Sequence, residues 1–234
     1  MKNSNKELVE ELYSKVFATG DIEVANSIIA GNYIQHNPMV KTGKAGFLEF
    51  LDQLKHLPKP QNPVKPFTRI ITEKDFVAVH SRINFMGQDR ATLDLYRIEA
   101  QQLAEHWDAS ELIINGSPNV LGPVEPNPNE DTTTNKRIVS EFADAVFAKG
   151  ELGRVSDLSQ PDLLVSDSLE KRECYVLHRL IGEHNFIVAQ GQLQFQGAPY
   201  VMYDIFQLGD GRILHHWTVK QLIPNEMAHD NGMI

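Results

Sequence analysis

The 234-residue sequence has a single cysteine, Cys174, and no apolar run near the ~20 residues that a membrane-spanning helix needs. One cysteine excludes an internal disulfide framework and favours a reducing compartment. Basic residues are also scarce, because 22 Lys and Arg face 31 Asp and Glu, for a formal net charge of −9. This charge argues against nucleic acid and anionic membranes as partners. The opening residues lack the pattern of a signal peptide, so we expect a cytoplasmic protein.

The sequence also lacks the short motifs that bind nucleotides, activate a serine nucleophile or hold zinc. It has no P-loop, GxGxxG, GxSxG, HExxH or CxxC pattern. His36, His80, His106 and Asp108 form the alternative metal set, but their spacing matches no such motif. We therefore expect no cofactor and no bound metal.

What the sequence does contain is a long internal repeat. Asp-Leu-Tyr-Arg-Ile at 94–98 and Glu-His-Trp-Asp at 105–108 recur as Asp-Ile-Phe-Gln-Leu at 204–208 and His-His-Trp-Thr at 215–218, 110 positions later. Helical segments near the start recur at an offset of 130 positions, so the second copy is 20 residues shorter. A period of this length indicates a duplicated domain and not a solenoid.

The repeat gives the domain organisation that we predict. Residues 1–115 form a first domain that holds the pocket, and residues 135–234 form a shortened second domain. Between them, residues 116–134 contain four prolines and no periodicity, which is typical of an interdomain linker. The polar tail after Pro224 is expected to fray or to fold over the surface.

Each copy is predicted to begin with helices. Ser4 and Glu7 form a capping box before an apolar stripe at helical spacing, which Gly20 ends. Asp21 opens a short second helix that runs through Ile29. Residues 33–38 are expected to be extended, and 43–54 to form a third helix before a Pro-rich loop at 58–66.

The rest of the first copy is rich in β-branched and aromatic residues. Strands are predicted at 67–72, 76–85, 91–98 and 103–114, with short breaks at 73–75, 87–89 and 99–101. Short breaks favour antiparallel neighbours, because parallel strands need long crossovers. The fold class that follows is α+β, with helices packed in a bent antiparallel sheet in each copy.

The order of these motifs resembles the SnoaL-like polyketide cyclase branch of the NTF2-like superfamily. The matching pieces are Tyr-Ile-Gln-His-Asn-Pro at 33–38, the helix beginning at Gly43, His80, and the motifs at 94–98 and 105–108. The resemblance implies two cone-shaped units, each with a curved sheet around a long helix and a pocket at its open end. It also implies pairing through the sheets, either within the chain or in a homodimer.

The same resemblance implies cofactor-independent aldol chemistry with an aspartate as acid or base and histidines around it. Carried onto this chain, the catalytic residues are Asp94, His80 and His36. The second copy departs from this pattern, with Ser166 in place of His36 and Gln190 in place of His80. We therefore interpret the second copy as a degenerate structural or pairing partner.

The residues themselves allow two readings of these positions. Burial among apolar neighbours makes the Asp94 carboxylate a stronger base, and His80 could donate a hydrogen bond to an enolate. Alternatively Asp94 is a buried structural aspartate, a reading that its recurrence as Asp204 favours. His36 lies either at the pocket rim or in a packed turn. The predicted substrate-binding residues are Tyr96, Trp107, His106, Asp108, Phe47 and Phe50.

Strand alternation places His106 and Asp108 on one face and Trp107 on the other. The recurrence of His106 and Trp107 favours a role in the fold, whereas Asp108 occurs only in the first copy and could orient a histidine.

The function that we predict is acid–base chemistry, of the aldol-cyclase or isomerase type, on a small, apolar, carbonyl-containing molecule in the pocket of the first copy. The alternatives are a hydrolase that uses Asp94 to activate water, and a non-catalytic ligand-binding or dimerisation module. An enclosed cavity where Asp94 and His80 converge would favour chemistry, and a filled cone would favour the module.

Overall fold

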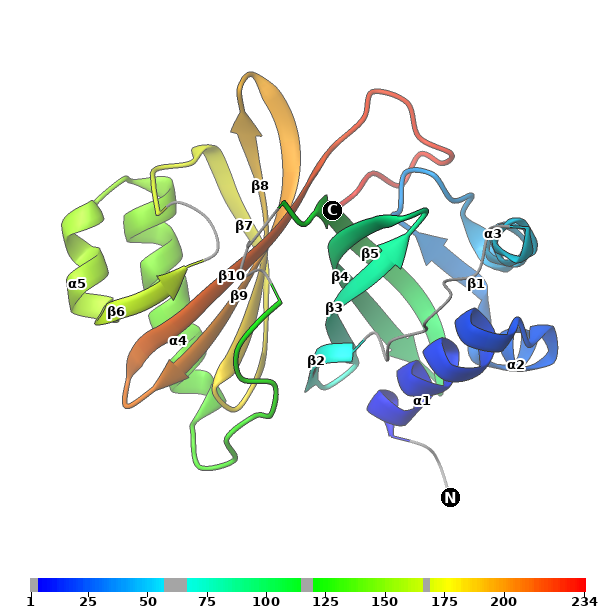
Figure 1. The fold of residues 1–234 in the computed structure, drawn as a ribbon, viewed down its shortest axis with the longest axis horizontal. Helices are drawn as coiled ribbons and strands as arrows, with labels where there is room; N and C mark the ends of the chain where they lie inside the picture. The colour runs from blue at the N-terminus through cyan, green and yellow to red at the C-terminus, as the bar shows by residue number, and fades with distance from the viewer. Residues whose placement is uncertain (1–3, 57–66, 115–119, 166–168) are drawn as a thin grey trace.

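The computed structural model describes residues 4–56, 67–114, 120–165 and 169–234. It contains two five-stranded sheets, each with its own helices (Figure 1). The strand order is β1-β5-β4-β3-β2 in the first sheet and β6-β10-β9-β8-β7 in the second, which is one order used twice. The predicted α+β class is confirmed. No helix in the described part of the chain is long and apolar enough to cross a bilayer.

The first unit opens with the predicted helices. They are α1 (Asn5–Glu11), the π-helical turn η1 (Leu12–Phe17), α2 (Ile22–Ile28) and α3 (Gly43–Lys55). The capping box of Ser4 and Glu7 is present, and the Asp21 side chain accepts a hydrogen bond from Val24 N at the start of α2. The predicted Pro-rich loop at 58–66 lies outside the described residues.

The sheet of the first unit consists of β1 (Ile29–Gln35), β2 (Phe67–Glu73), β3 (Phe76–Phe85), β4 (Gln88–Glu99) and β5 (Gln102–Leu112). β1 begins directly after α2, earlier than expected, and runs parallel to β5, while the other pairs are antiparallel. The turn between β3 and β4 is at Met86 and Gly87, both with positive φ, and not at 87–89. The position of this turn sets which residues of β3 and β4 lie opposite each other.

The described residues of the second unit repeat this plan but include no counterpart of α3. Its elements are α4 (Thr132–Phe142), η2 (Ala143–Ala148), η3 (Leu152–Arg154), α5 (Val155–Leu158), β6 (Ser159–Val165), β7 (Glu173–Glu183), β8 (Phe186–Phe195), β9 (Ala198–Gly209) and β10 (Arg212–Leu222). α4 begins at Thr132, within the stretch expected to be linker, because Asp131 caps it by accepting from Thr134 N. The described residues between β6 and β7 contain no helix.

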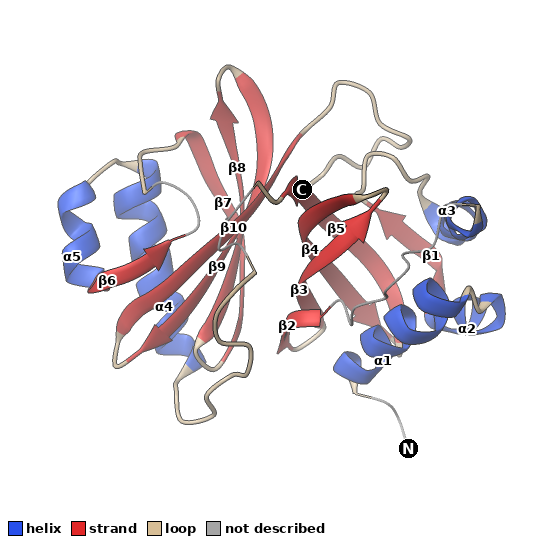
Figure 2. Cartoon of the chain, in the orientation of Figure 1, coloured by secondary structure: helices blue, strands red, loops and turns tan. Residues whose placement is uncertain are grey.

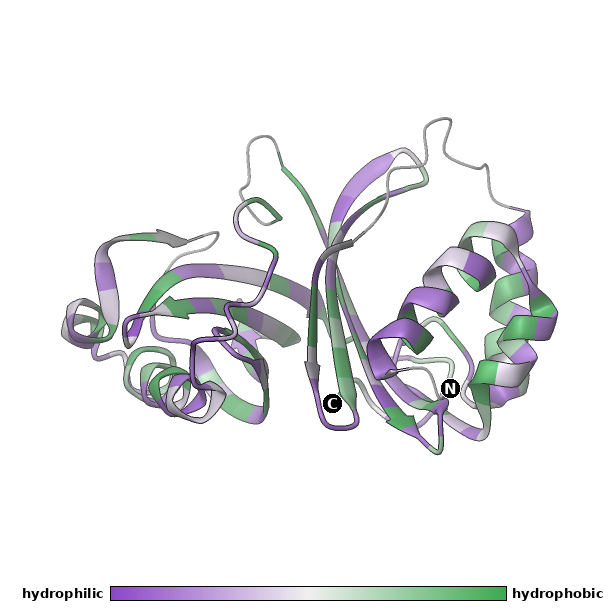
Figure 3. Cartoon of the chain, turned by 90° about the horizontal axis from the view of Figure 1, so that it is seen from below, coloured by the Kyte–Doolittle hydropathy of each residue, from purple (hydrophilic) through white to green (hydrophobic). Residues whose placement is uncertain are grey.

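The two sheets pack back to back, with the helices on the outer flanks (Figures 1 and 2). A shared core of buried residues from both sheets includes Leu93, Leu95, Val188 and Val219, and apolar segments run along the strands at this junction in Figure 3. Burial of apolar side chains contributes roughly 1.5–3 kcal/mol for each large one, so this core is a main source of stability.

Arginine and tryptophan side chains cross the junction in both directions. The guanidinium of Arg69 in the first unit lies 3.6 Å from the ring centre of Trp217 in the second, and that of Arg179 lies 4.3 Å from Trp107. Cation–π contacts at buried sites stabilise by roughly 0.5–2 kcal/mol each. The recurring tryptophans therefore serve the junction.

The segments outside the two units pack against them. Arg69 donates hydrogen bonds to the carbonyl oxygens of Leu121 and Pro123, and Trp217 Nε1 donates to Leu121 O, so the part of the expected linker described here is held in the junction. The C-terminal segment, residues 225–234, folds over the first unit and buries Met233 in the shared core. Folding over the surface, one of the two outcomes expected for this tail, is the one observed.

Candidate active site

The helix-facing side of the first sheet carries a cluster of polar side chains. Asp94 and Tyr96 in β4 lie directly opposite Asp108 and His106 in β5. Alternate residues of a strand point to the same side, so all four face the helices. The cluster thus lies between the first sheet and its helices, where η1 covers it.

Asp94 accepts a hydrogen bond on each carboxylate oxygen. Tyr13 in η1 donates its hydroxyl to Oδ2 at 2.7 Å, and His106 Nε2 lies 3.1 Å from Oδ1. Tyr96 donates to the Tyr13 hydroxyl at 3.3 Å and stacks on His106 with ring centres 4.6 Å apart. Burial, followed by the Asp94 charge, raises the pKa of Tyr13 well above its usual value, so this phenol stays a donor. π-helical turns are frequent at functional sites, and η1 places Tyr13 here.

His106 lies between two acceptors. Gln35 Oε1 accepts from the backbone N of His36 at 3.0 Å and of Asn37 at 2.9 Å, which fixes it as the amide oxygen. His106 Nδ1, at 2.9 Å from the same oxygen, must therefore carry a hydrogen. The contact between His106 Nε2 and Asp94 Oδ1 then needs a further proton between them. The His106–Asp94 contact is therefore a hydrogen bond in which the two groups can share one proton.

Asp108 differs from Asp94 in having a free oxygen. Its Oδ2 accepts from Asn37 Nδ2 at 2.6 Å, while Oδ1 is buried and has no hydrogen-bond partner among the described residues. Burial raises the pKa of Asp108 to about 6, with the nearby Asp94 charge acting in the same direction and His106 and Asn37 opposing it. An unpaired buried carboxylate oxygen is costly for the fold and is a feature of sites that bind or transfer protons.

The end of β1 completes the cluster. Tyr33, Gln35 and Asn37 alternate along the chain and point to the same side, and Gln35 lies beside His106 in the parallel pair of β1 and β5. Sequence reasoning missed Tyr13, Gln35 and Asn37. Gln35 and Asn37 could have been found from the extended motif at 33–38. Side chains alternate along an extended segment, so these two residues point to the face opposite His36.

His80, predicted to work beside Asp94, lies on the opposite face of the sheet. It pairs with Leu93, whereas Asp94 pairs with Val79. His80 Nδ1 accepts from Arg69 Nη1 at 3.0 Å, at the junction of the two sheets. The structure does not bring His80 and Asp94 together, because their side chains point to opposite faces of the sheet.

His36 and Trp107 also lie on the junction side. Their rings stack 4.7 Å apart, and His36 Nε2 is 2.9 Å from a carboxylate oxygen of Glu105. Burial lowers the pKa of His36, although Glu105 opposes the shift. His36 is therefore a packed turn residue, and Trp107 does not form a pocket wall.

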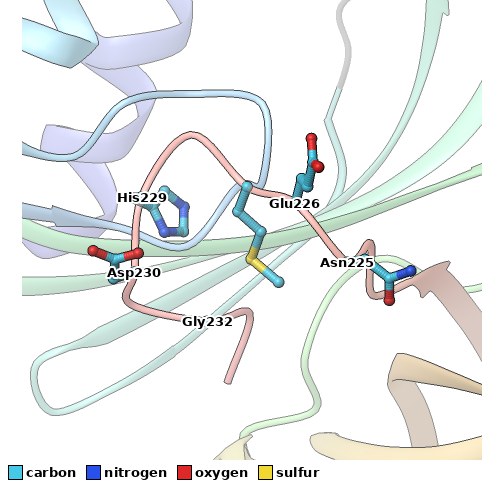
Figure 4. Close-up of a pocket in the computed structure, with 6 residues that line it drawn as sticks. Asn225, Glu226, His229, Asp230 and Gly232 are labelled. Carbon is cyan, nitrogen blue, oxygen red and sulfur yellow. The ribbon is translucent and has the colours of Figure 1, made fainter.

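The interior of the cone is largely filled by aromatic rings. Phe47 is 3% exposed and packs against Tyr33 and Phe17, with ring centres 5.6 and 6.1 Å away, while Phe50 on α3 is half-buried. A hollow of about 540 Å³ lies elsewhere, along Asn225–Gly232 of the C-terminal segment (Figure 4). Asp94 keeps 18% side-chain exposure.

Asp94, His106 and Asp108 each place one potential ligand atom within 4.8 Å of the others, a set that differs from the metal set considered in the sequence. Asp94 Oδ1 and His106 Nε2 are within hydrogen-bond distance of each other, and the other oxygen of Asp94 holds Tyr13. In the structure these atoms contact one another and Tyr13.

The second unit has an aspartate at the matching position, Asp204 in β9, opposite Thr218 in β10. Arg172 donates to both its oxygens at 2.5 and 2.6 Å, and His216 Nε2 lies 2.8 Å from Oδ1. Burial alone would raise the pKa of Asp204, but the Arg172 charge and the hydrogen bonds outweigh it and hold the value at about 2. Both oxygens of this carboxylate therefore have hydrogen-bond partners.

No family model and no curated protein matches the chain. Similar solved structures include a protein of unknown function with a cystatin-like fold from Xanthomonas campestris, at 21% identity and TM-score 0.39 over 46% of this chain and 91% of that one. An NTF2-like protein of unknown function from Cytophaga hutchinsonii has 19% identity and TM-score 0.38 over 47% and 95%. IdmH, "a putative polyketide cyclase" from Streptomyces antibioticus, has 19% identity and TM-score 0.36 over 47% and 93%. The likeness concerns the fold alone.

Proposed function

We propose that the first unit is a cofactor-independent acid–base catalyst for a small, largely apolar molecule that carries a carbonyl group. The observation that supports this most is the buried, unpartnered Oδ1 of Asp108, beside a His106–Asp94 pair that shares a proton. In this scheme Asp108 is the base, and the His106–Asp94 pair takes the donor role expected of His80.

The reaction divides into two proton movements. Asp108 Oδ1 takes a proton from the carbon next to the carbonyl. The electron pair of that C–H bond forms the C=C bond of the enolate, while the π pair of the carbonyl group moves onto its oxygen. The proton held between His106 and Asp94 passes to this developing enolate oxygen. A base is most effective when its pKa lies near the working pH, and the raised pKa of Asp108, about 6, meets that condition.

Aldol cyclisation and isomerisation both begin with this enolisation, and the sequence resemblance to SnoaL-like cyclases implies the same class. One rival is hydrolysis, with Asp108 activating a water. The other is a non-catalytic binding or pairing module, which the aromatic filling of the cone favours.

The test is enolisation itself. Deuterium uptake at the α-carbon of aromatic and cyclic ketones such as 1-tetralone would be followed by proton NMR in D2O. We expect wild type to accelerate uptake, and Asp108→Asn to lower the enzymatic rate by roughly 10²-fold or more, the usual contribution of a general base. Asp52→Asn, on the exposed side of α3, is the matched control and should keep the full rate.

A thermal-shift series with the same ketones separates binding from chemistry. Ligand at a hundred times its dissociation constant stabilises by ~2.7 kcal/mol. Stabilisation without deuterium uptake would support the binding module. Uptake that is equal in wild type and Asp108→Asn, or that requires an added divalent cation, would overturn the proposed mechanism.

A further inference from the structure

The C-terminal segment holds the loop that follows β1. Asn231 Nδ2 donates to Gln35 O and to Thr42 Oγ1, both at 2.9 Å. His229 Nε2 lies 2.9 Å from Asn37 O, and Ala228 N donates to Pro38 O at 2.8 Å. Figure 4 shows the segment curving back on itself, with His229 beside this loop. The loop is thus bound through backbone carbonyls from Gln35 to Pro38 and through the side-chain hydroxyl of Thr42.

The side chains of the same loop reach into the cluster. Gln35 Oε1 holds Nδ1 of His106, and Asn37 Nδ2 holds Oδ2 of Asp108. The C-terminal segment therefore holds the loop mainly through its backbone carbonyls, while the side chains of Gln35 and Asn37 bind the proposed donor and base. A shift of the loop would change both contacts together.

The C-terminal segment is itself anchored in the junction. It continues from β10 of the second unit, and Met233 near its end is 2% exposed within the core shared by the two sheets. Its path from one unit to the other is visible in Figure 1. The second unit thereby reaches the site of the first, which gives the degenerate copy a role beyond pairing.

We propose that Asn231 is a positioning residue: through Gln35 O and Thr42 Oγ1 it fixes the loop whose side chains orient His106 and Asp108. This inference deepens the proposed function and rests on it for its catalytic consequence. The hydrogen-bond network that it describes does not depend on turnover.

The experiment compares Asn231→Asp with Asn225→Asp. Both residues are exposed, lie in the same segment and undergo the same change of charge and shape. Asn225 makes none of the loop contacts described above. Asn231→Asp removes the amide group that donates to Gln35 O and Thr42 Oγ1. Nitrogen-15 NMR of His106 reports the exchange of its Nδ1 proton with solvent, and deuterium uptake reports kcat and KM.

We expect Asn231→Asp to speed exchange of the His106 Nδ1 proton by about tenfold, equivalent to ~1.4 kcal/mol, or one hydrogen bond. Its kcat should fall with KM nearly unchanged, because orientation and not substrate contact is lost. Asn225→Asp should match wild type in both. Asn231→Gln, which keeps the donor, should recover part of the loss.

The outcomes distinguish this inference from the proposed function. Faster His106 exchange in Asn231→Asp, in a protein that accelerates no deuterium uptake, would support the positioning and overturn the enzyme. A wild-type enzyme whose His106 exchange and kcat are unchanged in Asn231→Asp would overturn the positioning alone. Equal effects of Asn231→Asp and Asn225→Asp would also overturn it, since the change would then follow from charge.

Discussion

The two units place an aspartate at the same point of the same sheet and surround it differently. Asp94 is held by the phenol of Tyr13 and by the imidazole of His106. Asp204 is held by the permanent charge of Arg172 and by His216, and is 0% exposed. The position is therefore a property of the fold, and the neighbours decide whether the carboxylate can exchange protons.

The strand opposite each aspartate carries the second difference. Asp94 faces Asp108, while Asp204 faces Thr218. Burial raises the pKa of Asp108, with the Asp94 charge acting in the same direction, whereas the charge and hydrogen bonds of Arg172 outweigh burial at Asp204 and lower its pKa. The pKa of Asp108, about 6, lies above the ordinary pKa of an aspartate, and that of Asp204, about 2, lies below it. The two aspartates are therefore held in environments that shift their pKa values in opposite directions.

The largest expected effect comes from breaking the ion pair of the second unit. Arg172→Met leaves the buried Asp204 without its cation, and removing one partner of a buried pair costs about 3–5 kcal/mol. Urea unfolding at pH 7 measures this loss. Arg82→Met, which breaks a more exposed pair with Asp89, should cost less than ~1 kcal/mol. Equal losses in the two variants would contradict the comparison.

The same pair fixes a pH dependence. The folded pKa of Asp204, about 2, lies below the unfolded value of ~3.9. Its contribution, about 2–3 kcal/mol, is therefore complete above pH 4 and is lost as the pH falls toward 2. Wild type should show this drop in stability, and Arg172→Met should not.

A smaller effect of opposite sign is expected at the first site. The folded pKa of Asp108, about 6, lies above the unfolded ~3.9, so the folded state binds more protons and wild type loses stability as the pH rises from 4 to 6. Asp108→Asn removes this penalty. It should be more stable than wild type by about 1–3 kcal/mol at pH 8 and closely similar at pH 4.

Calorimetry at the two pH values measures the gain of Asp108→Asn. Asp204→Asn serves as the matched change in the other unit and should be destabilising at pH 8. If Asp108→Asn were also destabilising there, Asp108 would be a second structural carboxylate and the contrast between the two sites would disappear. A gain in stability with a loss of activity is the usual trade-off of a functional site.

The helices and strands could be predicted because their signals are local. The Ser4 capping box, the Asp21 cap and the run of Phe76–Phe85 each act within a few residues, and the structure has all three. The early start of β1 was missed because its pairing with β5 is distant in sequence and parallel. The path of the C-terminal segment over the first unit likewise depends on long-range contacts.

The candidate site was predicted only in part, for a reason of register. The sequence pointed to Asp94, His106 and Asp108, but it also placed His80 in the same pocket. Placing the β3–β4 turn at 87–89 allows His80 and Asp94 to share a face. The turn at Met86 and Gly87 instead sets Val79 opposite Asp94. A shift of one residue moves every side chain of a strand to the other face.

The smallest effect that we predict tests whether Asp94 depends on its phenol as Asp204 depends on its arginine. Tyr13→Phe removes the 2.7 Å hydrogen bond to Asp94 and should cost about 1.5 kcal/mol, within the range for a bond to a charged group. Tyr33→Phe removes a hydroxyl with a weaker 3.4 Å contact to Gln35 and should cost less. Urea unfolding of Tyr13→Phe, Asp94→Asn and the double variant gives their coupling. A coupling near zero would mean that the Tyr13 hydroxyl does not hold the carboxylate, and that the contact with His106 alone does so.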